Sequence, residues 1–413
     1  MLGRASRQGP GRRYPRFGAA LIAAGLLAAG GQARAFLDDR IDIIVEEKLL
    51  YDSNVFRLPA SRPPPLLAGG RRGDLSATTS VGLTFDVPYS RQRFQGTFLY
   101  NDTRYLEMSA LDWQGHDARA LWLWQVGQDW SGQLGYSNVK TLGSFADDFI
   151  KTPNKLQTEE ILLNGAYLVT PYWKVGAGVT RRDQANSEPL RQVNDLEMVT
   201  TELSVTHISR AKNQVGLSVR YEDGDYPHPT PSLAGPIDNA YRQKSVGVFT
   251  DWTLTGRSRI TARLDYVDRS YEQVPQRDFD GFTGRIAHDW KPTGRLVVIT
   301  TVQRDISAVE EVNTSFVRVT GASVRPTLTL TGRSTLSGVL EYALRDYLGD
   351  ARVAAVGLPQ REDKVFTAAA ALTWNVDRVL TMVFGLQHER RTSNLPLTDY
   401  DVNLVTLSGR FKF

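Results

Sequence analysis

The stretch DLSATTSVGLTFDVPYS, residues 74–90, decides the fold of this chain. Every second residue from Leu75 to Val87 is apolar or carries a methyl group, and the residues between them are small or polar. Successive side chains of a β-strand point to opposite faces of its sheet. The pattern therefore predicts a strand with one apolar face and one polar face.

The same alternation recurs along the chain, for example at 214–222, 336–344 and 405–413. No stretch after Phe36 shows a sustained helical period. The alternating stretches run to about 10–14 residues, whereas strands of soluble proteins usually have about five or six. Strands of this length favour a sheet that crosses a membrane.

Two kinds of connection separate the strands. Eight tight turns recur along the chain, at 87–90, 127–129, 170–172, 209–213, 255–258, 291–294, 327–332 and 375–377. The other connections are longer and polar or rich in Pro and Gly, such as 54–74, 143–157, 223–240 and 348–362. Eight turns and nine loops predict 18 strands, or 16 if one short strand pair is misassigned. Short turns on one rim and long loops on the other are typical of an antiparallel outer-membrane β-barrel, with both termini here on the turn side.

The tryptophans favour the barrel over a β-propeller, which also repeats about every 40 residues. A propeller blade packs four short strands into each repeat, whereas this chain shows two long ones. Six tryptophans lie within about three residues of a tight turn, at Trp124, Trp130, Trp173, Trp252, Trp290 and Trp374. We expect them to form an aromatic girdle at the periplasmic membrane interface.

The two ends of the chain support the same location. Residues 1–35 combine an Arg-rich start with the apolar run FGAALIAAGLLAAGG and an Ala-Arg-Ala site, which predicts a signal peptide cleaved before Phe36. The last strand places Val405, Leu407 and the terminal Phe413 on one face. A final strand that ends on an aromatic residue is what the outer-membrane barrel insertion machinery recognises, so we expect that machinery and outer-membrane lipid as partners.

Charge and composition exclude several classes of function. The signal segment holds six Arg and no acidic residue, so the remaining chain has 43 basic and 45 acidic residues and is not a nucleic-acid-binding protein by charge. The absence of Cys excludes disulfides and thiolate metal sites. The five His show no metal-ligand spacing, and no Gly-rich phosphate loop occurs. We therefore expect no metal, no cofactor and no enzymatic activity.

The polar faces of the predicted strands carry the candidate substrate-binding residues. A charge that faces lipid near mid-membrane costs about 2–4 kcal/mol, so Arg within a strand should face the lumen. The guanidinium groups of Arg and the carboxylates that face the lumen could bind passing sugar hydroxyls or acidic sugar groups. They could also simply pair with each other across strands. The predicted inward residues are Arg182, Arg220, Arg263, Arg285, Arg318 and Arg345, with Asp86, Glu202, Glu222, Asp265 and Glu341.

Several stretches resemble a known family. FDVPYSRQRF (85–94) and RALWLWQVGQDWSGQLGYS (119–137), with the shorter YDSNVFRL (51–58), RQVND (191–195), GDYP (224–227), QRDFDGFTGR (276–285) and DYLGD (346–350), are similar to the outer-membrane barrels called EpsL. Genes for EpsL lie in exopolysaccharide operons beside exosortase-type export systems, and the family belongs to a wider β-barrel porin group. The resemblance implies a role in biosynthesis or export of an extracellular polysaccharide, as in biofilms. It also implies periplasmic and inner-membrane export proteins as partners, and it supplies no catalytic motif.

The sequence thus predicts an 18-stranded outer-membrane barrel that acts as a passive conduit for a polysaccharide. Two alternatives remain at this point. One is a general diffusion porin, and the other is a surface barrel whose loops anchor polysaccharide while the lumen is closed.

Overall fold

The computed structural model describes residues 40–147, 151–231, 235–307, 316–348 and 360–413. The predicted signal peptide lies outside them. The described chain is built of strands with four short 3₁₀ helices, η1 (Leu66–Ala68), η2 (Ser109–Leu111), η3 (Pro189–Asn194) and η4 (Pro275–Arg277). The strands are β1 (Ile41–Asp52), β2 (Asp74–Tyr89), β3 (Gln92–Tyr105), β4 (Trp113–Val126), β5 (Trp130–Leu142), β6 (Lys155–Thr170), β7 (Trp173–Asn186), β8 (Leu196–Ile208), β9 (Gln214–Asp225), β10 (Tyr241–Thr255), β11 (Ser258–Tyr271), β12 (Phe279–Trp290), β13 (Leu296–Ser307), β14 (Phe316–Thr329), β15 (Ser334–Leu348), β16 (Glu362–Asn375), β17 (Leu380–Ser393) and β18 (Tyr400–Lys412).

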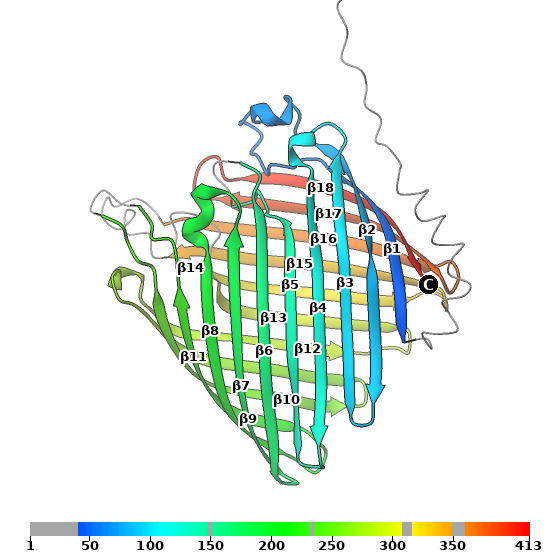
Figure 1. The fold of residues 1–413 in the computed structure, drawn as a ribbon, viewed down its shortest axis with the longest axis vertical. Coiled ribbons are helices and arrows are strands. Elements are labelled where there is room, and N and C mark those ends of the chain that lie inside the picture. The colour runs from blue at the N-terminus through cyan, green and yellow to red at the C-terminus, as the bar shows by residue number, and fades with distance from the viewer. Residues whose placement is uncertain (1–39, 148–150, 232–234, 308–315, 349–359) are drawn as a thin grey trace, which may run out of the picture.

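The strands form one closed antiparallel sheet in which each strand pairs with its neighbours in sequence. The sheet closes where β1 pairs with β18, and Ile43 and Phe413 exchange backbone hydrogen bonds of 3.0 Å in both directions. The prediction of 18 strands is confirmed, and the alternative of 16 is wrong. Figure 1 shows η1, η2 and η3 together on the rim that carries the long loops.

The outer surface is apolar, as the alternation predicts. On β9 the exposed large apolar side chains are Val215, Leu217, Val219 and Tyr221, and on β15 they are Leu336, Leu340, Tyr342 and Leu344. These residues show which side chains of β9 and β15 face outward. The residues directly opposite them on the neighbouring strands face outward as well. Among the described residues, no helix is long and apolar enough to cross a membrane.

Aromatic side chains mark both edges of the apolar surface. Near the tight turns, Trp130, Trp173, Trp252, Trp290 and Trp374 are all 41–51% exposed. Trp124 shares this face, because it pairs with Gly132 and covers it. Nearer the long loops, the outward register carries Tyr100, Tyr136, Tyr221, Tyr266 and Tyr342. Amphipathic rings prefer the two interfaces of a bilayer, so these two belts bound the membrane-spanning zone.

A small hydrophobic core lies among the long loops. It joins Phe56 and Leu58 of the β1–β2 loop to Met108 and Leu111 of the β3–β4 loop and to Phe145 of the β5–β6 loop. The Phe56 and Phe145 rings are 4.7 Å apart, and Phe56 is fully buried. Three loops on the same rim are therefore held together by apolar packing.

Candidate functional site

One side of the lumen, on β6 to β11, carries a network of ion pairs. Arg220 on β9 and Arg263 on β11 both bind Glu202 of β8, with N–O distances of 3.0 and 3.1 Å. Arg263 also binds Asp265 at 2.8 Å and donates a hydrogen bond of 2.9 Å to the Ser218 hydroxyl. On the neighbouring strands, Arg182 of β7 pairs with Glu160 of β6. The structure thus brings these predicted residues together on the lumen side, where they form cross-strand pairs.

Arg285 on β12 differs from the other inward arginines. It lies directly opposite Arg263 on β11 and Gln303 on β13, in the register that faces the lumen. Its side chain is exposed. Within the described residues it has no ion pair and no side-chain hydrogen bond. All five donors of this guanidinium are therefore available to a solute in the lumen.

The remaining predicted residues on the inward face are also paired. Asp86 on β2 binds Arg93 of β3, and Glu341 on β15 binds Arg325 of β14 at 3.2 Å. Glu222 on β9 is buried, binds Arg269 at 3.4 Å and accepts a hydrogen bond of 2.8 Å from the Tyr241 hydroxyl. Whether any of these groups contacts a substrate stays a prediction.

The inward placement of Arg318 is wrong. Arg318 pairs across β14 and β15 with Asp346, at an N–O distance of 2.7 Å, in the same register as the outward Leu344 and Leu340. The reason is its height on the barrel. Arg318 lies near the loop end of β14, beyond the outward Tyr342 and outside the zone between the aromatic belts, where an outward charge can pair with Asp346.

The sequence did not indicate the main cluster of the lumen, which forms around Asp147 in the β5–β6 loop. The Asp147 carboxylate accepts hydrogen bonds from Arg391 and, at 3.0 Å, from the Tyr347 hydroxyl. It lies 3.6 Å from both Arg345 and Arg361. Arg391 also donates to the Ala146 carbonyl oxygen. A loop between β5 and β6 is thus fixed to the inward side of β15, β16 and β17.

Ion pairing controls the charge of Asp147. Burial acts to raise its pKa, but the guanidiniums of Arg391, Arg345 and Arg361 outweigh burial and hold the pKa below its usual value of 3.8. The carboxylate is therefore ionised at neutral pH. Asp363 of β16, fully buried, is the second acid of the cluster and binds Arg361 at 2.7 Å.

The β5–β6 loop has a second attachment only two residues away. Phe145 belongs to the apolar core of the loops, and the buried Lys151 ammonium donates a hydrogen bond of 2.6 Å to its carbonyl oxygen. The loop therefore joins the core over β1 to β5 to the arginine cluster on β15 to β17. It crosses part of the lumen on the rim of the long loops.

The wall below the arginine cluster is lined by small side chains. The inward registers of β15, β16 and β17 carry Ser337 and Val339, then Ala369 and Ala371, then Val383 and Gly385. Between these residues and the cluster, Glu341 and Glu389 lie on either side of Thr367. The lumen thus presents a patch of small side chains near the tight turns of β15 to β17, and charged side chains above this patch and on β6 to β12.

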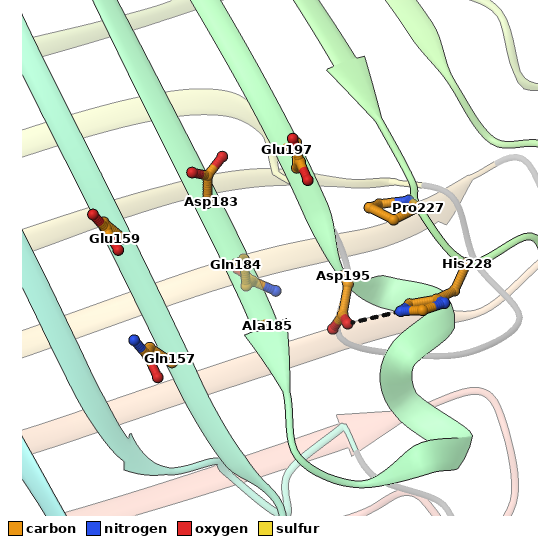
Figure 2. A pocket seen from close by; sticks show the side chains of 9 residues that line it. All are labelled: Gln157, Glu159, Asp183, Gln184, Ala185, Asp195, Glu197, Pro227 and His228. Atoms are coloured by element: carbon orange, nitrogen blue, oxygen red, sulfur yellow. Dashed lines mark ion pairs between the residues drawn. The ribbon is translucent and has the colours of Figure 1, made fainter.

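The outer face carries an acidic row that we do not assign to the site. Glu159, Asp183 and Glu197 are directly opposite one another on β6, β7 and β8, on the outward register. Figure 2 shows them in a shallow pocket with Asp195, whose carboxylate is 3.6 Å from the His228 imidazole. Arg181 binds both Asp183 and Glu197, at 3.0 and 3.2 Å. Across the described residues, no group of three or more His, Cys, Asp or Glu side chains could hold a metal ion.

Comparisons with known proteins agree with this architecture. A family model described as "Putative beta-barrel porin 2" matches residues 244–413, from within β10 to the end of the chain. The crystal structure of Pseudomonas aeruginosa OccK9 (OpdG) aligns with a TM-score of 0.50 at 12% identity, covering 92% of this chain and all of that one. Pseudomonas aeruginosa OpdK aligns at a TM-score of 0.48 and 11% identity, with the same coverage. No curated protein matches the sequence.

The chain is an outer-membrane β-barrel. Its sheet closes with 18 strands, its last strands match a porin family model, and it shares its fold with OccK9. The prediction of an outer-membrane location is confirmed. The resemblance to EpsL and the absence of enzymatic activity stay predictions.

Proposed function

We propose that the barrel is a channel for polar saccharides, and that its cargo is an extracellular polysaccharide or its fragments. The observation that carries the proposal is the two-sided lumen. Arg, Glu and Asp on β6 to β12 can bind sugar hydroxyls and acidic groups, while the small side chains of β15 to β17 suit the C–H faces of a sugar ring. The proposal that the cargo is a polysaccharide comes from the similarity to EpsL.

Transport through such a lumen is passive. Most inward arginines already have carboxylate partners, so each offers a sugar only the donors that its ion pair leaves free. Weak binding at many sites allows a solute to enter and to leave. The driving force comes from polymerisation or from a partner, because the sequence contains no nucleotide-binding motif.

Deletion of the gene in the producing bacterium tests the proposal. We expect polysaccharide to be lost outside the cell and to accumulate in the periplasm, and the wild-type gene on a plasmid to restore secretion. Arg220→Gln/Arg263→Gln on the same plasmid tests the charged wall, with Arg318→Gln on the outer face as its matched control. Unchanged secretion in the deletion strain would contradict the polysaccharide cargo.

A general diffusion porin is the second candidate, and the β5–β6 loop favours it. A loop fixed across the lumen by Asp147 and Phe145 narrows the path, which suits small solutes better than a polymer. Liposome swelling separates the two functions. Rapid entry of mono- and disaccharides, together with normal polysaccharide secretion in the deletion strain, would favour the general porin.

A further inference from the structure

We propose that the cluster of Arg345, Arg361 and Arg391 is a binding site for the carboxylate of an acidic saccharide, and that Asp147 occupies this site as an internal ligand. The inference rests on the proposed function, since it assigns a substrate class to the same lumen. It assigns the site to uronic acids and similar sugar acids, and it excludes neutral sugars.

The charge of the cluster carries the first part of the argument. Among the described residues, three guanidiniums face two carboxylates, and one of these, Asp363, is fully buried on β16 within the wall. The other carboxylate, Asp147, comes from a loop that is anchored on the far side of the lumen. If Asp147 leaves, the described part of the cluster holds one carboxylate for three guanidiniums, which is an excess of positive charge. A buried excess of this kind is costly unless another anion takes the place of Asp147.

Two of the three arginines have further contacts that do not involve Asp147. The Arg361 guanidinium lies over the Tyr347 ring at 3.9 Å and pairs with Asp363, and the Arg391 guanidinium lies over the Tyr400 ring at 4.6 Å. Arg391 also donates a hydrogen bond of 3.1 Å to the Thr398 carbonyl oxygen. The site is therefore preorganised for a carboxylate, and an incoming anion does not have to order the side chains.

One donor of the cluster is unused while Asp147 is bound. The Nε atom of Arg345 is buried and has no hydrogen-bond partner among the described residues. The Asp147 carboxylate approaches Arg345 only through Oδ2, at 3.6 Å. A free carboxylate is not tied to a loop and can turn to satisfy this donor as well, which gives it an advantage over the internal ligand.

Competition between the two carboxylates has a measurable consequence. An internal ligand lowers the apparent affinity for an external one, because only the fraction of molecules with an empty site can bind it. A bound sugar acid should therefore displace Asp147 and release that attachment of the β5–β6 loop. Phe145 keeps the other attachment in the apolar core.

Calorimetric titration of the purified barrel with glucuronate tests the proposal, with glucose as the neutral probe. Asp147→Asn keeps the shape of the side chain and removes its charge, so we expect it to bind glucuronate at least tenfold more tightly than the wild type. Arg345→Gln in the Asp147→Asn background should reverse most of this gain. Asp117→Asn is the matched control, because Asp117 is an inward acid that pairs with Arg119 on β4, outside the cluster.

Equal glucuronate affinity of the wild type and Asp147→Asn, with both proteins folded by heat-dependent migration on a gel, would overturn the proposal. Equal binding of glucose and glucuronate by Asp147→Asn would overturn it too. These affinity measurements do not depend on transport. If the variants bind as expected and the deletion strain still secretes polymer, the anion site stands and the polysaccharide cargo fails. If secretion is lost and the affinities are equal, the cargo stands and the anion site fails.

Discussion

Arg263 and Arg285 lie directly opposite each other on β11 and β12, and carboxylates hold only Arg263. Two like charges at adjacent positions normally repel each other. Glu202 and Asp265 neutralise Arg263, so the lumen next to them tolerates one further cation. Among the described residues of this wall, Arg285 is therefore a cation that can act on a charged solute without first leaving a carboxylate partner.

Arg285→Gln should make the channel less selective for anions. A unit charge about 8 Å away in water contributes about 0.5 kcal/mol, which corresponds to a roughly twofold fall in the anion-to-cation permeability ratio. Reversal potentials across a lipid bilayer in a KCl gradient measure this ratio. Arg285→Lys should keep it. A Gln variant with the wild-type reversal potential would show that Arg285 does not face the conducting path.

Arg220→Gln/Arg263→Gln should change both selectivity and stability. The substitutions leave Glu202 and the buried Asp265 without their cations, so the channel should shift toward cation selectivity. Removing one partner of a buried pair costs about 3 kcal/mol. We expect a lower urea midpoint for a barrel that still folds. A wild-type midpoint would mean that these pairs contribute little to stability.

The attachment of the β5–β6 loop should be insensitive to pH until strongly acidic conditions. The pKa of Asp147 is depressed in the folded state, so its contribution is complete above the usual value of 3.8 and is lost as the pH falls through the folded pKa. Conductance should stay constant from neutral pH to about pH 4 and should rise below it. Asp147→Asn should show the higher conductance at every pH. A transition near pH 6 would point to another group.

Phe145→Ala should loosen the same loop from its other end. Truncation of a buried Phe lowers stability by about 3–5 kcal/mol. Here we expect the change to destabilise the loop core and not the barrel. We expect larger and noisier single-channel currents with an unchanged urea midpoint. Leu66→Ala is the matched control, because Leu66 lies in the neighbouring β1–β2 loop and is completely exposed. Equal single-channel currents in the two variants would show that Phe145 does not help to constrict the lumen.

Arg318→Gln/Asp346→Asn should leave conductance and selectivity unchanged. The pair lies on the outer surface, and exposed ion pairs contribute about 0–1 kcal/mol. Reversal potentials and single-channel currents should match those of the wild type. A change in selectivity would mean that Arg318 faces the lumen after all.

The sequence predicted the barrel well because alternation is a local signal. Between the two aromatic belts, apolar residues must face lipid, so Leu217 and Leu340 identify the outward register directly. Beyond the tyrosine belt this signal no longer holds for every residue. There Val317 and Tyr347 are buried on the inward side, and Arg318 and Asp346 lie outside, so the same reasoning placed Arg318 wrongly.

The Asp147 cluster could not be predicted in this way. Its loop has no periodicity, and the partners Tyr347 and Arg391 lie 200 and 244 residues further along the chain. A single acidic residue in a polar loop does not indicate which of the inward arginines it will contact. Only the closed sheet brings them together. Arg285 could not be singled out from the sequence either. Alternation predicts that its side chain faces the lumen, but it does not predict that the side chain lacks a partner among the described residues.

The pairing of β1 with β18 has a consequence for biogenesis. The contact between Glu46 and Arg410 joins residues 364 positions apart, so the two edges meet only after the whole sheet has been synthesised and exported. Until then every intermediate has two bare edges that could pair with another chain and aggregate. The pairing of the last strand, which has 13 residues, with β1 therefore removes both bare edges in a single step.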